Sequence, residues 1–434
     1  MLISFLSGYC SYVSSYTEPT EGHPTVTIDS GVVIGRETSL PPSLATVNHF
    51  LGIPFSESAL RFSPPEAVKS WKSAFDASSY GPACIQQFNY PQRSRDDLRK
   101  WANTLGPAAG ESDDSNSLAG YDGSSLAANQ DVVVVTINYR TNVFGFANSP
   151  NLPKPERNLG LLDQRLALDW VQRNIAAFGG DPSRVTIAGE SAGAMSVDAL
   201  VTNPPVPLSF RAAILQSGQT SFSISGGSEA SWSMLLNVTN CSPNRDLERL
   251  PRLNSTVKHS QIARVPVMLG SNGGESRTFV GTLNLTAPLS MLLRETKSDL
   301  WQETVDAYPV GEPGIATQAD RISKIITDLQ FDCPAQLMAD DNASVGISAW
   351  RYLYNASFSN TQLYLEPEAT VTQKEVNRIM QKACADFVKE PYYGPGWAAV
   401  PSVALFSNGR KVTVDSTVFD ARCQLYQSLY DLRK

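Results

Sequence analysis

The run from 131 to 139 (DVVVVTINY) constrains the fold of this chain more than any other segment. Valine, threonine and isoleucine are branched at Cβ and favour strands, and an uninterrupted apolar run suits a strand buried on both faces of a parallel sheet. Parallel strands need crossover connections, which are usually helices. The run therefore predicts a sheet with helices on both of its faces.

Helical and strand-like segments alternate after this run. A helix is predicted from about 161 to 178, because Leu162, Leu166 and Trp170 recur at four-residue spacing, and the pair Gly179-Gly180 ends it. Apolar strands are predicted at 185–189, 212–215, 265–269 and 350–354, and a hairpin at 25–28 and 31–34. The alternation predicts a mostly parallel, doubly wound central sheet flanked by helices.

Charge and hydropathy exclude some partners. The chain has 434 residues, a net charge of −7 and no long run of lysine and arginine, so we expect no nucleic-acid partner. No uncharged apolar stretch approaches the ~18 residues that a membrane-spanning helix requires. These features are typical of a soluble enzyme or a soluble relative of one.

One motif carries chemistry. In Gly189-Glu190-Ser191-Ala192-Gly193 an apolar strand runs into a Gly-x-Ser-x-Gly sequence and a helix-compatible stretch follows, as a nucleophile elbow requires. Gly189 and Gly193 would lack side chains because the strand and the helix approach closely there. Ser191 would then lie at a helix N-terminus, and the Ala192 N–H could donate to an oxyanion. The alternative is an ordinary strand-to-helix turn with small residues for packing.

Compartment signals are mixed. Residues 1–22 are predicted as a poorly defined N-terminal leader, apolar at first but without a basic region. The six cysteines form no CxxC pair, so structural disulfides are favoured and no metal site is expected. Six Asn-x-Ser/Thr sequons favour a secreted glycoprotein. Their asparagines are Asn237, Asn240, Asn254, Asn284, Asn342 and Asn355.

Several long segments resemble the type-B carboxylesterase family, which includes cholinesterases and lipase-like esterases. The most specific are NYRTNVFGF (138–146) and the stretch 158–196, which contains NLGLLDQRLAL, FGGDP and GESAGAMS. FLGIPF (50–55), RFSPP (61–65), Tyr121-Asp122-Gly123 and Gln216-Ser217-Gly218 resemble the family too. The resemblance extends over about 25–430 with interruptions, and it identifies 23–434 as a type-B carboxylesterase domain.

The resemblance implies an α/β-hydrolase fold and a carboxylic-ester hydrolase that works through a serine nucleophile. Residue by residue, Ser191 falls on the nucleophile, Ala192 on one oxyanion-hole donor, and Glu275, in the turn after 265–269, on the acid of the triad. Cys333 and Cys423 fall on a late family disulfide. The implied substrate is a small-molecule or lipid ester, with no cofactor.

The chain departs from the family pattern at three places. All three of its histidines, His23, His49 and His259, precede Glu275, whereas the family's base follows the acid. The strand and glycine-rich turn that should come before Tyr121 are skipped, so we expect a central sheet short of one strand and weakened folding. The stretch 218–265 also looks shortened, with Glu248 in place of a cysteine.

Three readings remain open on the sequence. The chain is an ester hydrolase acting through Ser191, or a non-catalytic relative that acts by binding. The third reading is that coding sequence was wrongly excised from the gene of an active esterase, because each of the three gaps removes a strand or a loop in frame. The sequence makes no prediction of the acyl group or of the oligomeric state.

Overall fold

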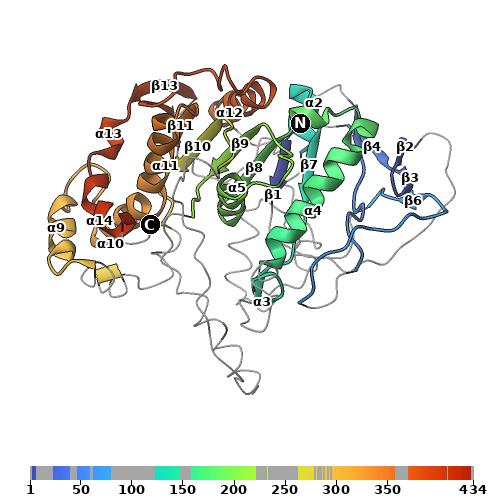
Figure 1. Cartoon of the computed structure of the whole chain (residues 1–434). Helices are drawn as coiled ribbons and strands as arrows, with labels where there is room; N and C mark the ends of the chain where they lie inside the picture. The colour runs from blue at the N-terminus through green and yellow to red at the C-terminus, as the bar shows by residue number, and fades with distance from the viewer. Residues whose placement is uncertain are drawn as a thin grey trace, which may run out of the picture.

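In this computed structural model (Figure 1), the chain folds around one large sheet. The structure describes residues 2–5, 23–39, 46–58, 62–79, 123–146, 158–220, 232, 262–277, 280, 286, 289–290, 293, 296–356, 370–407 and 409–431.

The central sheet has eight strands among the described residues, in the order β13-β12-β11-β10-β9-β8-β1-β7. All neighbouring strands run parallel except β12 and β13, which pair antiparallel at one edge. The sheet is therefore mostly parallel, as expected. The strands are β1 (Leu2–Phe5), β7 (Val134–Ile137), β8 (Thr186–Glu190), β9 (Ala212–Gln216), β10 (Val267–Asn272), β11 (Ala349–Tyr354), β12 (Ser402–Ser407) and β13 (Arg410–Asp415).

Strand β1 corrects the expectation of a missing strand. It lies between β7 and β8 and pairs in parallel with both, Leu2 opposite Val134 and Thr186, and Phe5 opposite Ile137 and Gly189 (Figure 1). Four residues within the segment predicted as a leader thus supply two ladders of hydrogen bonds at the centre of the sheet. The described sheet has no gap there. Residues 6–22 lie outside the described residues, so the boundary at 22 stays a prediction.

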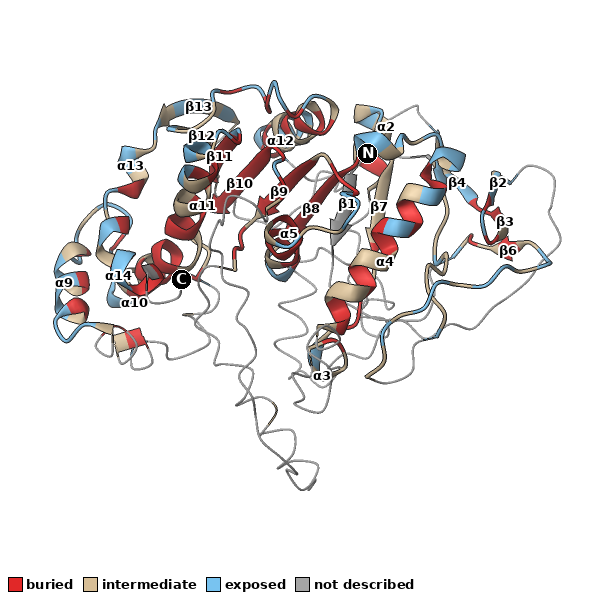
Figure 2. Ribbon diagram, in the orientation of Figure 1, coloured by how far each residue is buried: buried red, intermediate tan, exposed pale blue. Residues whose placement is uncertain are grey.

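Helices cover both faces of the sheet, since successive strand residues point to opposite sides. Ile187, Ala213 and Leu269 pack on one face with the helices α4 (Leu159–Asn174), α5 (Ala192–Thr202) and α11 (Cys333–Ser344). Ala188 and Met268 pack on the other face with α12 (Val371–Lys389). Figure 2 shows the central strands buried and the outer turns of the covering helices exposed. Double coverage explains why β8, β9 and β10 are apolar along most of their length.

The helices begin and end where local chemistry favours it. Thr370 caps α12 by accepting from the Gln373 N–H, and Gln373 accepts in return from the Thr370 N–H. The predicted helix at 161–178 is α4 followed by a 3₁₀ turn, and Gly179 ends it at a φ of +79°. The helices are α2 (Ser124–Gln130), α3 (Asn142–Gly145), α4 (Leu159–Asn174), η5 (Ile175–Phe178), η6 (Pro182–Arg184), α5 (Ala192–Thr202), α9 (Leu300–Ala307), α10 (Gln318–Thr327), π-helical η7 (Asp328–Asp332), α11 (Cys333–Ser344), α12 (Val371–Lys389), α13 (Thr417–Asp420), η8 (Cys423–Tyr426) and α14 (Gln427–Asp431).

Two small sheets lie between β1 and β7 in the chain. The first contains the predicted hairpin, β2 (Thr25–Ile28) and β3 (Gly31–Ile34), together with β6 (Phe75–Asp76). The second pairs β4 (Arg36–Ser39) with β5 (Thr46–His49). Arg140, just after β7, forms a buried ion pair with Asp163 of α4 at 2.7 Å and donates to the Ser63 carbonyl at 2.6 Å, which ties the N-terminal part to the central sheet.

A second apolar cluster lies in the helical part near the C-terminus. Leu300, Ile325, Leu329 and Tyr426 are buried in it, beside the disulfide between Cys333 and Cys423 that the resemblance implied. Within the residues that the structure describes, no helix is long and apolar enough to cross a membrane.

Candidate active site

The turn after β8 has the conformation that a nucleophile elbow requires. Strand β8 ends at Glu190, α5 begins at Ala192, and Ser191 between them has φ +53° and ψ −117°, a region that non-glycine residues rarely adopt. The Ser191 N–H donates to the Gln216 carbonyl at 2.8 Å, which fixes the turn against the end of β9. Strain of this kind marks candidate functional positions.

The glycines around the turn are required by close backbone approach. A Cβ atom on Gly189 would lie 2.2 Å from the carbonyl carbon and oxygen of Gly193, and one on Gly218 would lie 2.5 Å from the Ser191 carbonyl oxygen. Neither position can therefore carry a side chain without moving the main chain. This is the close packing that the sequence predicted for Gly189, and Gly218 adds a second contact.

Ser191 is accessible. Both Ser191 and Ala192 are exposed, and no hydrogen bond between described residues involves the Ser191 hydroxyl. The Ala192 N–H is the first in α5 and is among the four that a helix cannot pair internally. The helix dipole and this N–H favour negative charge beside the serine.

Glu275 lies in a tight turn after β10. One carboxylate oxygen accepts from the Asn272 N–H at 2.6 Å and the other from the Asn272 side-chain amide at 3.2 Å. Burial raises the pKa of Glu275, while hydrogen bonds from Ser217 and Asn272 oppose that rise. The turn therefore holds a carboxylate near the end of β10, where the sequence predicted it.

Ser217 joins the two turns, and sequence reasoning gave it no role. It is buried with φ +56°, its N–H donates to the Gly270 carbonyl at 2.8 Å, and its hydroxyl lies 3.4 Å from the Asn272 amide nitrogen and bonds Glu275. Since Gly218 touches the Ser191 backbone, the end of β9 connects the serine to the acid. The signal was available in Gln216-Ser217-Gly218, a polar sequence at the end of an apolar strand.

Glu190 is a second carboxyl group that sequence reasoning left without a role. It is half-buried, and none of the hydrogen bonds between described residues reaches its side chain. Burial, and then the nearby Glu275 carboxylate, raise the pKa of Glu190 to about 7. Glu190, which directly precedes the serine, thus faces a second carboxyl group, and the two like charges disfavour each other.

The structure brings no histidine to this site among the residues that it describes. His23 Nδ1 lies 3.2 Å from the Gly35 carbonyl oxygen, and His49 Nε2 contacts the hydroxyl of Ser124, the first residue of α2. His259, the skipped glycine-turn region at 92–120 and the segment 357–369 lie outside the described residues.

The two predicted glycosylation sites within the described residues differ in exposure. Asn342 lies inside α11 with 2% of its surface exposed, and its amide donates to the Met338 carbonyl at 2.7 Å, so it is not available to a glycan in this fold. Sequon spacing carries no information on burial, which is why the sequence could not exclude it. Asn355 is exposed just after β11. The other four asparagines, Asn237, Asn240, Asn254 and Asn284, lie outside the described residues.

No group of three or more histidine, cysteine, aspartate or glutamate side chains suited to a metal ion occurs in the described part of the chain. The arrangement that is present consists of an exposed hydroxyl at Ser191 and, beside it, the first N–H of α5 at Ala192. What it lacks in the described ranges is a group that accepts the serine proton as an imidazole would.

Comparison with known proteins gives a consistent picture. The chain matches the carboxylesterase family over residues 22–115 and 107–258, which together are more than half of its length. Acetylcholinesterase of Bungarus fasciatus is 39% identical over 226 residues, covering 45% of this chain and 37% of the relative. Cholinesterase of Mus musculus is 34% identical over 277 residues, covering 54% of this chain and 44% of the relative. Carboxylesterase 5A of Canis lupus familiaris is 36% identical over 229 residues, covering 46% and 40%. In each case less than half of the relative's own length is covered.

Proposed function

Because this chain belongs to the carboxylesterase family, we propose that its site serves ester hydrolysis with Ser191 as the nucleophile. The observation that carries the proposal is the strained, exposed Ser191 between β8 and α5, joined through Ser217 to the Glu275 carboxylate. Small-molecule or lipid esters are the substrate class. The disulfide between Cys333 and Cys423 supports secretion, since such bonds persist in oxidising compartments.

The reaction runs through an acyl-enzyme. Ser191 Oγ bonds to the ester carbonyl carbon, its proton leaves to a base, and the carbonyl oxygen becomes an oxyanion near the Ala192 N–H. The intermediate then expels the alcohol, which takes up the proton. Water attacks the acyl-Ser191 ester next and releases the carboxylic acid and the free serine. Glu275 would orient and stabilise the protonated base in these steps.

The base is the missing part. No histidine follows Glu275 in the sequence, and removing the base of such a triad costs about a million-fold in rate. We therefore expect this chain to acylate slowly and to turn over p-nitrophenyl acetate at or near background.

Labelling of Ser191 tests the proposal without requiring turnover. A fluorophosphonate should label Ser191 slowly, with peptide mapping as the readout and Ser191→Ala as the matched control. Labelling of a different serine, or equal labelling of the Ser191→Ala variant, would contradict the assignment. Fast stoichiometric labelling, or an esterase rate within about tenfold of an ordinary enzyme that Ser191→Ala abolishes, would show that a substitute base exists.

A binding function is the second candidate, and the absence of a histidine after Glu275 favours it. A binder would retain its affinity for an ester or its acid product in the Ser191→Ala variant and show no acylation. A version that restores a glycine-turn segment near Ser115 and a histidine loop near Thr361 separates the readings. Hydrolysis by the restored protein through Ser191 would support wrongly excised coding sequence, whereas a well-folded but inactive restored protein would favour binding.

A further inference from the structure

The end of β10 joins two parts of the molecule. Ser271 and Asn272 are successive residues and therefore point to opposite faces of the sheet. Asn272 donates twice to Glu275, as described above, whereas the buried Ser271 hydroxyl donates to the buried Asp332 carboxylate at 2.5 Å. The end of β10 is thus hydrogen-bonded both to the turn that holds Glu275, here called the acid turn, and to the π-helical turn η7.

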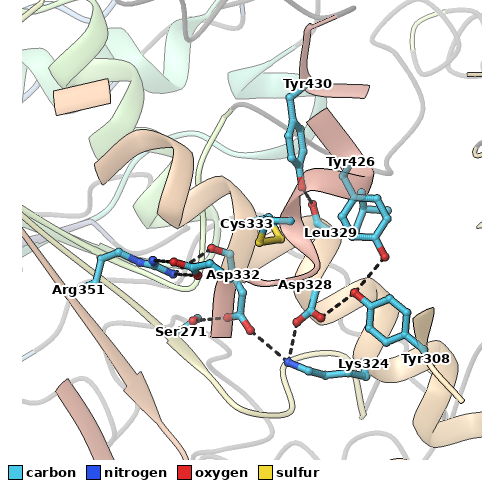
Figure 3. Close-up of a disulfide and its surroundings, with 12 residues drawn as sticks. Ser271, Tyr308, Lys324, Asp328, Leu329, Asp332, Cys333, Arg351, Tyr426 and Tyr430 are labelled. Carbon is cyan, nitrogen blue, oxygen red and sulfur yellow. Dashed lines mark hydrogen bonds and ion pairs between the residues drawn. A yellow bond between two sulfur atoms is a disulfide. The ribbon is translucent and has the colours of Figure 1, made fainter. Parts of the chain in front are cut away.

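The Asp332 carboxylate is itself held in place. Figure 3 shows Lys324 between two carboxylates, with its Nζ 2.6 Å from Asp328 Oδ1 and 3.5 Å from Asp332 Oδ2. The Tyr308 hydroxyl donates to the other Asp328 oxygen at 2.7 Å. Cys333 follows Asp332 directly and is bonded to Cys423. The carboxylate that holds Ser271 therefore stands on a crosslinked, charge-paired segment.

A second contact joins the same two parts. Ser276, the residue after Glu275, is buried, and its N–H and its hydroxyl each lie 3.4 Å from the Thr327 hydroxyl oxygen. Thr327 ends α10 and directly precedes η7. Residues on both sides of Glu275 thus contact the stretch 327–332, and Glu275 lies between the two contacts.

We propose that Asp332 is a positioning residue for Glu275, which acts through Ser271 to hold the acid turn closed on Asn272. The inference rests on the proposed function, in which Glu275 is the acid. The charge of Asp332 also acts on the turn, since it contributes to raising the pKa of Glu275. If Asp332 served stability alone, substituting it in a protein that still folds would leave the hydrogen bonds between Asn272 and Glu275 unchanged.

Amide hydrogen exchange tests the mechanical part on the protein as it exists, because the Asn272 N–H is protected only while the turn is closed on Glu275. Asp332→Asn and Ser271→Ala should each speed exchange of the Asn272 amide by about tenfold relative to the Leu269 amide in the same strand. The control is Asp420→Asn, which alters a buried carboxylate paired with Arg351. Arg351 also donates to the Asp332 main-chain carbonyl at 3.4 Å, so this variant perturbs the same region but keeps the bond between Ser271 and the Asp332 carboxylate. It should leave that ratio unchanged.

Titration of the Glu275 carboxyl group gives a second readout that a purely structural role would not move. The titratable groups that interact with Glu275 in the described structure are Glu190 of β8, Asp332 of η7 and Tyr352 of β11. Ser217 and Asn272 supply its hydrogen bonds. In protein labelled with ¹³C at glutamate Cδ and assigned with Glu275→Gln, Ser271→Ala keeps the charge of Asp332 but loosens the turn. The Asn272 hydrogen bonds that lower the pKa of Glu275 then weaken, and this pKa should rise. Asp332→Asn also removes a charge that raises the pKa of Glu275, so its rise should be smaller than in Ser271→Ala.

The proposal is overturned if Asn272 exchange in Asp332→Asn matches that of the wild type, or if Asp420→Asn speeds it equally. Neither measurement requires a reaction at Ser191. Failure of Ser191 to react with a fluorophosphonate would therefore count against the proposed function alone, and a response of the Asn272 amide would still support the positioning role.

Discussion

Buried charged groups are paired in the network around the disulfide (Lys324, Asp328, Asp332, Arg351 and Asp420) but not at the site edge (Glu190 and Glu275). In the network each charged group faces an opposite one, Lys324 between Asp328 and Asp332, and Arg351 with Asp420. At the site edge Glu190 has no hydrogen-bonding partner among the described residues and faces a second carboxyl group, Glu275.

This difference separates two purposes within one fold. Paired charges fix a geometry, and their loss is costly because one partner remains buried without compensation. Unpaired buried carboxyl groups destabilise the folded state, but their raised pKa lets them gain or lose a proton near neutral pH. The network should therefore dominate the stability of the protein, whereas variants at the site edge should be neutral or stabilising.

The largest effect should come from breaking the Arg351–Asp420 pair. Asp420 binds the guanidinium at 2.7 and 3.0 Å, and both side chains are at most 7% exposed. Asp420→Ala leaves Arg351 buried without its partner and should lower the free energy of unfolding by about 4 kcal/mol. Chemical denaturation measures it.

The exposed pair Lys382–Asp386 is the control, and Asp386→Ala should cost at most a few tenths of a kcal/mol. Equal losses for the two variants would show that burial does not distinguish these pairs.

Removing the disulfide should have the next largest effect. The bond joins residues 90 positions apart and connects the start of α11 to the C-terminal helices. The double variant Cys333→Ala/Cys423→Ala should lose about 3 kcal/mol, because the unfolded chain regains conformational freedom. Thermal unfolding of the variant beside the oxidised wild type measures the loss, and the reduced wild type should match the variant. A loss below about 1 kcal/mol would show that the charge pairs alone hold this region.

The sequence predicted the central part of the fold because its signals are local. Apolar runs located β8, β9, β10 and β11 to within three residues at each end, and a four-residue spacing located α4. The run at 131–139 gave a strand limited to Val134–Ile137, because Asp131 is a left-handed cap with φ +50° at the end of α2. Strand β1 escaped prediction because a short, mostly apolar segment near the N-terminus also fits a leader.

The site was predicted as far as motifs extend. The elbow and the acid turn carry short sequence patterns, and the structure places Ser191 and Glu275 in such turns, although their roles remain proposals. The Asp332 link was not predictable, because Ser271 lies 61 positions from Asp332 and Arg351 lies 69 from Asp420. Partners at such separations are determined by packing rather than by a local pattern.

The pH dependence of stability should expose the cost of the unpaired carboxyl at Glu190. Its pKa rises from an ordinary 4.5 in the unfolded chain to about 7 in the folded protein, so the folded state binds the extra proton between these values. Stability therefore falls as pH rises from 4.5 to 7 and changes no further from this group above that. Glu190→Gln removes the loss and should stabilise the protein by on the order of 2 kcal/mol at pH 8 and little at pH 5.

Unfolding free energies of wild type and Glu190→Gln at the two pH values measure this difference. Glu390→Gln, at a side chain that is 64% exposed, is the control and should change stability little at either pH. A stabilisation by Glu190→Gln that is equal at pH 5 and pH 8 would mean that burial of charge at Glu190 is not its source.

The smallest change in the free energy of unfolding should come from substituting Ser191. The sign of this change tests whether the site edge differs from the network. Ser191 is exposed, has no described hydrogen bond at its hydroxyl and has φ +53°, so the fold gains little from its side chain and bears the strain of its backbone. Ser191→Ala keeps that strain and should change the free energy of unfolding by less than about 0.5 kcal/mol. Ser191→Gly relieves it and should stabilise by up to about 1 kcal/mol, since glycine adopts positive φ freely, although its greater freedom in the unfolded chain offsets part of the gain. Thermal unfolding of the two variants side by side decides the matter. A loss above 1 kcal/mol in Ser191→Ala would mean that the hydroxyl is paired in solution, and the site edge would then resemble the network.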